Sequence, residues 1–125
     1  MKITSFTKPK GLITLSAALI LIIDPNIILQ LLGAQLEAAG VMMTRILGGA
    51  YLVSGIGIWS INAPGDISTR DAWLYAMGES VAAVSVLLTA SIGALNLLGW
   101  VLAFAYVLFA CGFVFVALET QRLNV

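Results

Sequence analysis

Long runs of apolar residues dominate the chain, and short polar segments separate them. A helix that crosses the hydrocarbon core of a bilayer needs about 20 mostly apolar residues, with a range of about 17–25. Four segments reach or nearly reach this length, at residues 9–23, 36–61, 72–90 and 97–118, and the first of them is short. The pattern therefore predicts an all-α, polytopic membrane protein. We expect four transmembrane helices in an up-down bundle, forming a single integral membrane domain over residues 1–125.

The polar segment after the first span carries helix signals of its own. A residue before proline is pushed out of the α region, so Asp24-Pro25 ends the first helix. The same two residues suit the N-cap and first position of another helix, and Gly33 suits its end. We predict a short helix over residues 25–32 that lies in the membrane interface, with an unwound loop as the alternative.

Two segments of similar sequence suggest an internal repeat. Residues 29–33 read L-Q-L-L-G and residues 95–99 read L-N-L-L-G, with further matches downstream. This alignment predicts that spans one and two and spans three and four form equivalent hairpins of the same orientation. Chance matching in so restricted a composition is the alternative.

The composition excludes several classes of protein. Hydrophobic residues make up 61% of the 125 residues and charged residues 10%, against about 25% charged in ordinary soluble domains. So few charges cannot form the polar surface of a soluble domain, which excludes an ordinary cytosolic enzyme and a disordered tail. Six basic residues balance six acidic ones, so no net charge attracts the chain to nucleic acid.

Residues suited to catalysis or metal binding are scarce. The chain has no histidine and one cysteine, Cys111, so it offers no metal site and no disulfide of its own. We expect Cys111 to be a small packing residue. We also expect no enzymatic activity and no intrinsic cofactor, while contact with lipid, quinone or pigment stays open.

The basic residues predict an orientation. With four spans, five of them lie on the side of the termini and the 62–71 loop, namely Lys2, Lys8, Lys10, Arg70 and Arg122. The opposite side, residues 24–35 and 89–96, contains none. Basic residues concentrate on the cytoplasmic side, so both termini should be cytoplasmic. Three tryptophans near the span ends are predicted interfacial anchors: Trp59, Trp73 and Trp100.

Two charged residues lie inside predicted spans, Arg45 in the second and Glu79 in the third. Each is about eight residues, or roughly 12 Å, from the start of its span. Because these spans run in opposite directions across a core of about 30 Å, the two depths differ by about 6 Å. We therefore predict an intramembrane Arg45–Glu79 pair. It is either a functional site for a polar ligand, an ion path or a partner, or a structural contact; separate snorkelling to headgroups is the further alternative.

Small residues recur along two of the spans. In lipid, helices associate where small side chains allow their backbones to approach. The predicted helix-packing residues are Gly48, Gly49, Gly55, Gly78, Ala82 and Ser85. They serve either tight packing within the bundle or docking of other subunits. The phenylalanines of the fourth span are expected to face lipid, with pigment tails or a neighbouring helix as alternatives: Phe104, Phe109, Phe113 and Phe115.

Residues 43–55, M-T-R-I-L-G-G-A-Y-L-V-S-G, resemble the R-x-x-G…G second-helix signature of small membrane proteins of the DoxX-like group. Asp24-Pro25 and the Leu-Leu before Gly33 are also similar to that group, and the resemblance covers roughly residues 10–60. It implies a four-span protein of the bacterial inner membrane. Some members of the wider group associate with quinone-linked oxidoreductases, which implies an accessory role. Arg45 is the residue that carries over, whereas the chain lacks histidine and paired cysteines for redox chemistry.

Two functional hypotheses follow. The first is a non-catalytic accessory subunit of a larger membrane complex, of respiratory or photosynthetic type, that packs through small-residue faces. The alternative is a homo-oligomeric small transporter or channel that uses the Arg45–Glu79 pair. The expected partners are the lipid bilayer and other membrane subunits or further copies of the chain, and not nucleic acid.

Overall fold

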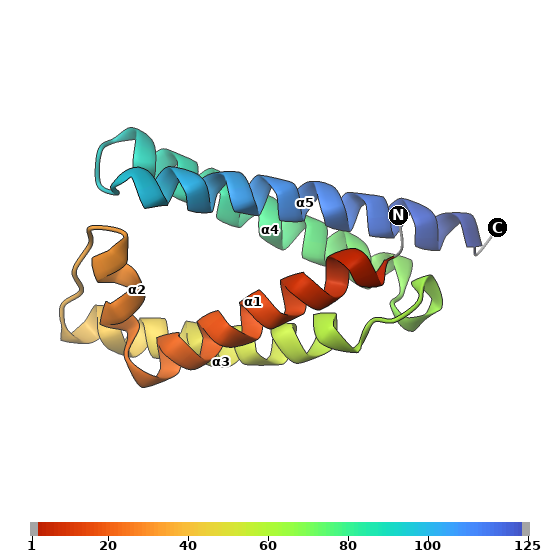
Figure 1. The fold of residues 1–125 in the computed structure, drawn as a ribbon, viewed down its shortest axis with the longest axis horizontal. Coiled ribbons are helices and arrows are strands. Elements are labelled where there is room, and N and C mark those ends of the chain that lie inside the picture. The colour runs from red at the N-terminus through yellow and green to blue at the C-terminus, as the bar shows by residue number, and fades with distance from the viewer. Residues whose placement is uncertain (1–2, 124–125) are drawn as a thin grey trace. The chain divides into compact units, whose positions relative to one another are not determined.

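The structure, a computed structural model, describes residues 3–123, whose regular elements are all helices, with no strand among them (Figure 1). The elements in chain order are α1 (Thr4–Ile23), α2 (Pro25–Leu31), α3 (Ala38–Ser60), the 3₁₀ helix η1 (Pro64–Asp66), α4 (Thr69–Ser91) and α5 (Leu97–Leu123). α1, α3, α4 and α5 are each long and apolar enough to cross a membrane. The predicted all-α fold, with four membrane-length helices and a short helix after the first, is confirmed.

Three of the long helices, α1, α4 and α5, extend beyond the predicted spans, α4 by three residues at its start and one at its end. α1 begins at Thr4 and contains Pro9, although the apolar pattern had predicted a start at residue 9. Proline lacks the N–H that would bond the carbonyl four residues earlier, but this loss falls close to the helix start. α5 continues past residue 118 to Leu123. Apolar patterns cannot mark these polar end turns, so the helices are longer than the spans.

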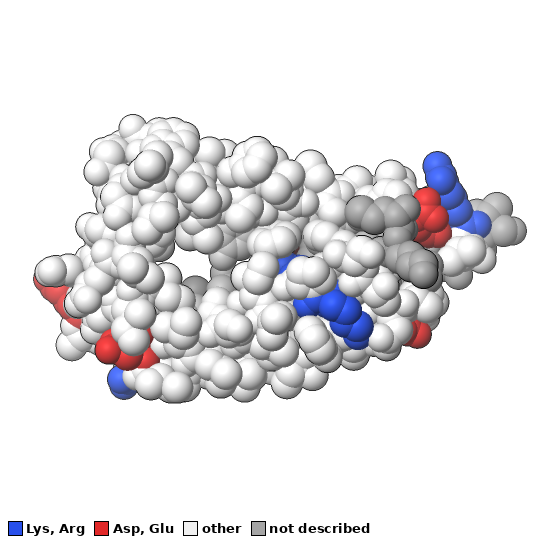
Figure 2. All heavy atoms as spheres, viewed as in Figure 1, with Lys and Arg blue, Asp and Glu red and all other residues white. Residues whose placement is uncertain are grey.

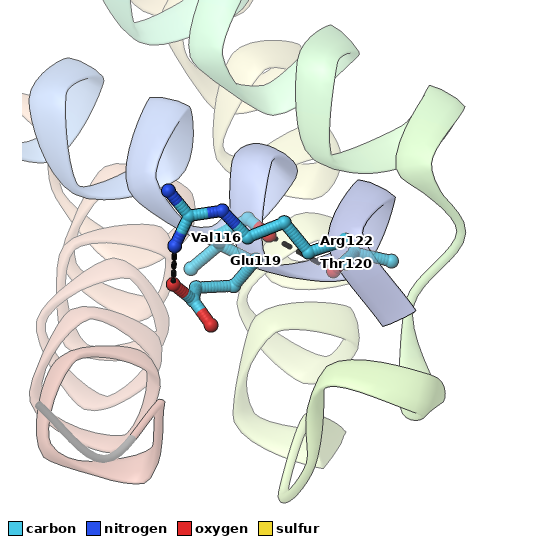
Figure 3. Close-up of polar contacts among 4 residues, drawn as sticks. All are labelled: Val116, Glu119, Thr120 and Arg122. Atoms are coloured by element: carbon cyan, nitrogen blue, oxygen red, sulfur yellow. Dashed lines mark hydrogen bonds and ion pairs between the residues drawn. The ribbon is translucent and has the colours of Figure 1, made fainter. Parts of the chain in front are cut away.

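The last turn of α5 is held by local polar contacts, which Figure 3 shows. Arg122 Nη1 lies 3.2 Å from Glu119 Oε1, and Thr120 Oγ1 donates to the carbonyl oxygen of Val116 at 2.9 Å. Residues three and four apart are neighbours on a helix, so such pairs support the turn that contains them. The Arg122 side chain is exposed, which limits the energy of this ion pair.

The chain forms two compact units that meet in sequence between Ile61 and Asn62. In the first, which we call the N-terminal hairpin, α3 runs back along α1 and α2 lies at the turn. In the second, the C-terminal hairpin, α5 runs back along α4 and η1 contacts α5. Most of the surface visible in Figure 2 is uncharged, as expected for helices that face lipid.

α2 begins as the sequence predicted. The Asp24 carboxylate accepts a hydrogen bond from the backbone N–H of Asn26 at 3.1 Å, and Pro25 is the first helical residue. The helix ends at Leu31, one residue before the predicted end, and Gly33 follows with a φ of 80°. Glycine adopts this left-handed conformation without the steric cost that other residues incur. The short helix is therefore confirmed.

The same backbone turn closes both hairpins. Gly33 N–H donates to Gln30 O, and the next N–H donates to Leu29 O. Gly93, with a φ of 76°, makes the equivalent bond to Ala90 O, and the N–H after it donates to Thr89 O. These are Schellman motifs. The structural counterpart of Gly33 is thus Gly93. The sequence alignment of residues 29–33 with 95–99 is wrong, because it matches Gly33 to a residue inside α5.

Glycines on both helices set the packing of the N-terminal hairpin. A Cβ at Gly11 would lie 2.9 Å from Trp59 Cα, and one at Gly55 would lie 2.8 Å from Leu15 Cγ. Leu15 lies four residues after Gly11 on α1, and its partner Gly55 lies four residues before Trp59 on α3. Gly48 continues this register seven residues further, since its Cβ would lie 2.9 Å from Ile22 Cγ1. The two backbones therefore approach closely along their length.

Alanine has the same role in α4 of the C-terminal hairpin. The buried residues of α4 are Ala72, Ala76, Ala83 and Ala90. The last three are seven residues apart, the spacing of a seam between closely packed antiparallel helices. On α5 the buried set combines small and large residues: Gly99, Ala103, Phe113, Val116, Ala117 and Thr120. Small residues on α4 thus leave room for larger ones on α5.

Candidate functional site

Arg45 is the eighth residue of α3, and its side chain reaches the end of α1. Its Nη2 atom donates to the carbonyl oxygen of Ile23, the last residue of α1, at 3.4 Å. The last carbonyls of a helix lack partners inside the helix and carry partial negative charge. The exposed guanidinium thus supplies a hydrogen bond and a positive charge at the point where α1 ends and α2 begins.

Lys8 makes the reciprocal contact at the other end of the N-terminal hairpin. Its Nζ atom donates to the carbonyl oxygen of Trp59, in the last turn of α3, and lies 5.2 Å from the centroid of the Trp59 ring. Beside it, Thr7 Oγ1 donates to Ile61 O at 3.0 Å. A cation above an indole ring is electrostatically attracted to it. Lys8 therefore joins the start of α1 to the end of α3.

A buried row of polar side chains along α1 was missed by the sequence analysis. Thr7, Lys10 and Thr14 are respectively 0%, 5% and 7% exposed. Their spacing of three and four residues places them on one side of the helix. Polar residues at helical spacing within an apolar span are a signal that the sequence contains. From its position near the chain start, Lys10 was predicted only to be one of the basic residues on the side of the termini.

Glu79 lies deeper in its helix than predicted. α4 begins at Thr69, so Glu79 is its eleventh residue, about 15 Å from the helix start instead of roughly 12 Å. One turn earlier, Tyr75 stacks on Phe113 of α5, with ring centroids 5.0 Å apart and an interplanar angle of 23°. Arg45 and Glu79 belong to different compact units, and their pairing stays a prediction.

The predicted helix-packing residues divide into two groups. Gly48 and Gly55 are buried against α1, as described above. Gly49 and Gly78 are exposed, and a Cβ at either would meet no atom within 4 Å among the described parts of the chain. Ala82 is half-buried and Ser85 is exposed on the same side of α4 as Gly78. The first group serves the hairpin, and the second leaves α3 and α4 with open small-residue positions.

The aromatic residues and the cysteine also differ in their surroundings. Trp59, Trp73 and Trp100 are exposed near the ends of α3, α4 and α5, where anchors were predicted. Phe104 is exposed, as expected for a lipid-facing residue. Phe113 is fully buried, so for this residue the expectation of a lipid-facing side chain is wrong; it packs on a neighbouring helix. Cys111 is exposed, so its expected packing role is also wrong.

Comparison of the chain with protein-family models, with curated proteins and with solved structures gives no match. The resemblance of residues 10–60 to the DoxX-like group therefore stays a prediction.

Proposed function

We propose that this protein is a non-catalytic accessory subunit of a larger membrane complex, of respiratory or photosynthetic type. The observation that supports the proposal is the open position of Gly49 and Gly78 on two membrane-length helices. Gly78 shares its side of α4 with Ala82 and Ser85, so α4 presents small residues to its surroundings as well as to α5.

The cost of glycine in a helix makes these positions informative. Glycine in a helix interior is less favourable than alanine by about 1 kcal/mol. Gly48 and Gly55 offset that cost through close contact with α1, and Gly33 and Gly93 through left-handed turns. Neither reason applies to Gly49 or Gly78. Close approach by a helix of another subunit is a further reason for glycine at membrane depth.

The charges within each hairpin support an orientation with cytoplasmic termini. Lys8 and Lys10 lie in the first half of α1, Arg70 in the first turn of α4 and Arg122 in the last turn of α5. The turns that close the hairpins contain no Lys or Arg between residues 24–37 and 92–96. Lys2, the fifth basic residue of the predicted set, lies outside the described residues. We place the protein in the bacterial cytoplasmic membrane, to which the DoxX-like resemblance also points.

The competing hypothesis is a homo-oligomeric transporter or channel that uses Arg45 and Glu79. The contact between Arg45 and the end of α1 favours the accessory role, because it gives Arg45 a structural task at a helix terminus. Wild-type protein reconstituted alone should then show no flux that depends on Arg45.

Copurification from native membranes in a mild detergent tests the proposal. We expect the wild-type chain to retain defined partner subunits and Gly78→Leu to lose them, because leucine would keep the partner helix away. Val84→Leu, at an exposed position on another side of α4, is the matched control and should retain the partners. A chain that purifies as a monomer without partners under these conditions would contradict the proposal.

A further inference from the structure

Arg45 and Asp24 are both at the junction of α1 and α2, yet they form no ion pair. Arg45 Nη2 is 3.4 Å from the carbonyl oxygen of Ile23, and Asp24 is the next residue along the chain. Within residues 3–123, that carbonyl is the one partner of the Arg45 side chain. The backbone N–H of Asn26, 3.1 Å from Oδ1, is likewise the one partner of the Asp24 carboxylate. Two opposite charges therefore share this junction without a bond between them.

Both side chains have hydrogen-bonding capacity left. A guanidinium has five N–H donors in a planar fork, and the contact with Ile23 uses one of them. A carboxylate has two oxygens, and the N-cap bond to Asn26 uses Oδ1. Arg45 is exposed and Asp24 is half-buried. The groups left over are a cationic donor and an anionic acceptor, which together suit a ligand that carries both charges.

By its depth the junction belongs to the headgroup region and not to the bilayer centre. Along α3, Arg45 is 14 residues from Trp59, a predicted interfacial anchor at the opposite end, which corresponds to about 21 Å. A hydrocarbon core is about 30 Å thick, and a long arginine side chain covers part of the difference by extending toward the headgroups. Ile23 and Ile46, beside the charges in sequence, are 73% and 62% exposed. Charges edged by exposed apolar side chains suit an amphiphile.

We infer that Arg45 and Asp24 bind the phosphoethanolamine headgroup of a phospholipid. The phosphate accepts hydrogen bonds from the fork of Arg45, since guanidinium and phosphate match in two parallel bonds. The primary ammonium, two carbons from the phosphate oxygen, donates to Oδ2 of Asp24. The acyl chains run over Ile23 and Ile46 toward the bilayer centre. With both termini in the cytoplasm, this lipid belongs to the outer leaflet.

The carboxylate of Asp24 selects this headgroup over those of other phospholipids. A headgroup with a phosphate alone places its negative charge beside Asp24, where like charges repel. A quaternary ammonium has the right charge but no N–H to donate to Oδ2. A primary ammonium satisfies the carboxylate while the phosphate satisfies Arg45.

Native mass spectrometry of the delipidated full chain in detergent, titrated with single phospholipids, tests the inference. The wild type should bind one phosphatidylethanolamine about tenfold more tightly than phosphatidylglycerol, the factor expected from one charge-assisted hydrogen bond. Asp24→Asn should weaken the ethanolamine lipid about tenfold and abolish this preference, while asparagine preserves the N-cap of α2. Arg45→Gln should weaken both lipids about tenfold. Arg122→Gln removes an exposed cation from the C-terminal hairpin and, as the matched control, should leave both affinities unchanged.

Soluble glycerophosphoethanolamine, which has the headgroup without acyl chains, separates a lipid site from a site for a free phosphate ester. It should not displace the lipid at equal concentration, and displacement would overturn the lipid assignment. If Arg45→Gln fails to fold, Asp24→Asn still decides, because an unchanged preference in this variant overturns the inference. Equal binding of the two lipids by the wild type overturns it as well. Since lipid titration needs no partner subunit, either result is distinguishable from failure of the accessory-subunit proposal.

Discussion

Arg45 donates a hydrogen bond over 3.4 Å to the carbonyl oxygen of Ile23, where α1 ends. Lys8 of α1 donates in turn to Trp59 O near the end of α3. Each of these antiparallel helices therefore provides a cation to the negative end of the other. The carbonyls at a helix C-terminus attract positive charge most strongly where water is scarce. The contact with Ile23 therefore gives Arg45 a structural role within its own hairpin.

Arg45→Gln should lower the stability of the protein modestly, by on the order of 1 kcal/mol, because the contact lies at an exposed helix end. Thermal unfolding in detergent, followed by circular dichroism, measures the effect. The same substitution in a Glu79→Gln background distinguishes the two roles of Arg45. Additive effects support the contact with Ile23, whereas strong coupling would support the Arg45–Glu79 pair instead.

Gly11→Ala should destabilise the N-terminal hairpin by about 1–3 kcal/mol, since the new Cβ would lie 2.9 Å from the Trp59 backbone and force α1 away from α3. Gly49→Ala is the matched control, because its Cβ would enter open space on α3. Alanine should there raise the helix stability by up to about 1 kcal/mol. Opposite shifts of the unfolding midpoint are expected, and equal destabilisation by both variants would count against the glycine-based register.

Phe113→Ala should be strongly destabilising, by about 3 kcal/mol, because this fully buried ring stacks on Tyr75 and its removal leaves a cavity between α4 and α5. Phe104→Ala changes an exposed residue of the same helix and should have little effect on unfolding. Near-ultraviolet circular dichroism should also lose intensity in Phe113→Ala as the Tyr75 environment changes. Similar midpoints for the two variants would be inconsistent with the packing described for α5.

The orientation proposed from the basic residues is testable by cysteine labelling in intact cells. With Cys111 replaced by serine, a cysteine at Asn62 should react with a membrane-impermeant thiol reagent only after the membrane is opened. A cysteine at Ala94, in the turn that closes the C-terminal hairpin, should react in intact cells. Labelling at Asn62 from outside would reverse the assigned orientation.

Local signals in the sequence predicted the turns well. Asp24-Pro25 and Gly33 bounded α2 to within one residue, because capping and positive φ depend on a few adjacent residues. The length and apolar character of the four long helices likewise followed from the hydrophobic runs.

The packed faces were harder to predict. In lipid both sides of a helix are apolar, so no polar side marks the surface that packs on another helix. Gly48 and Gly49 look equivalent in sequence, yet one is buried on α1 and the other is exposed. The packing role of Gly11 was not predicted, because it depends on a contact with Trp59, which is 48 positions away in the chain. The burial of Lys10 was not predicted for the same reason, since it depends on three-dimensional packing.

The paired Schellman turns at Gly33 and Gly93 have a consequence for biosynthesis. Each hairpin contains the turn that reverses the chain and also its own basic residues at the open end, Lys8 and Lys10 in one and Arg70 and Arg122 in the other. The two halves thus carry separate basic residues, and we expect each half to set its own direction in the membrane. We expect each to enter the bilayer as a helical pair, so that a chain divided between Ile61 and Asn62 would yield two fragments with unchanged orientation.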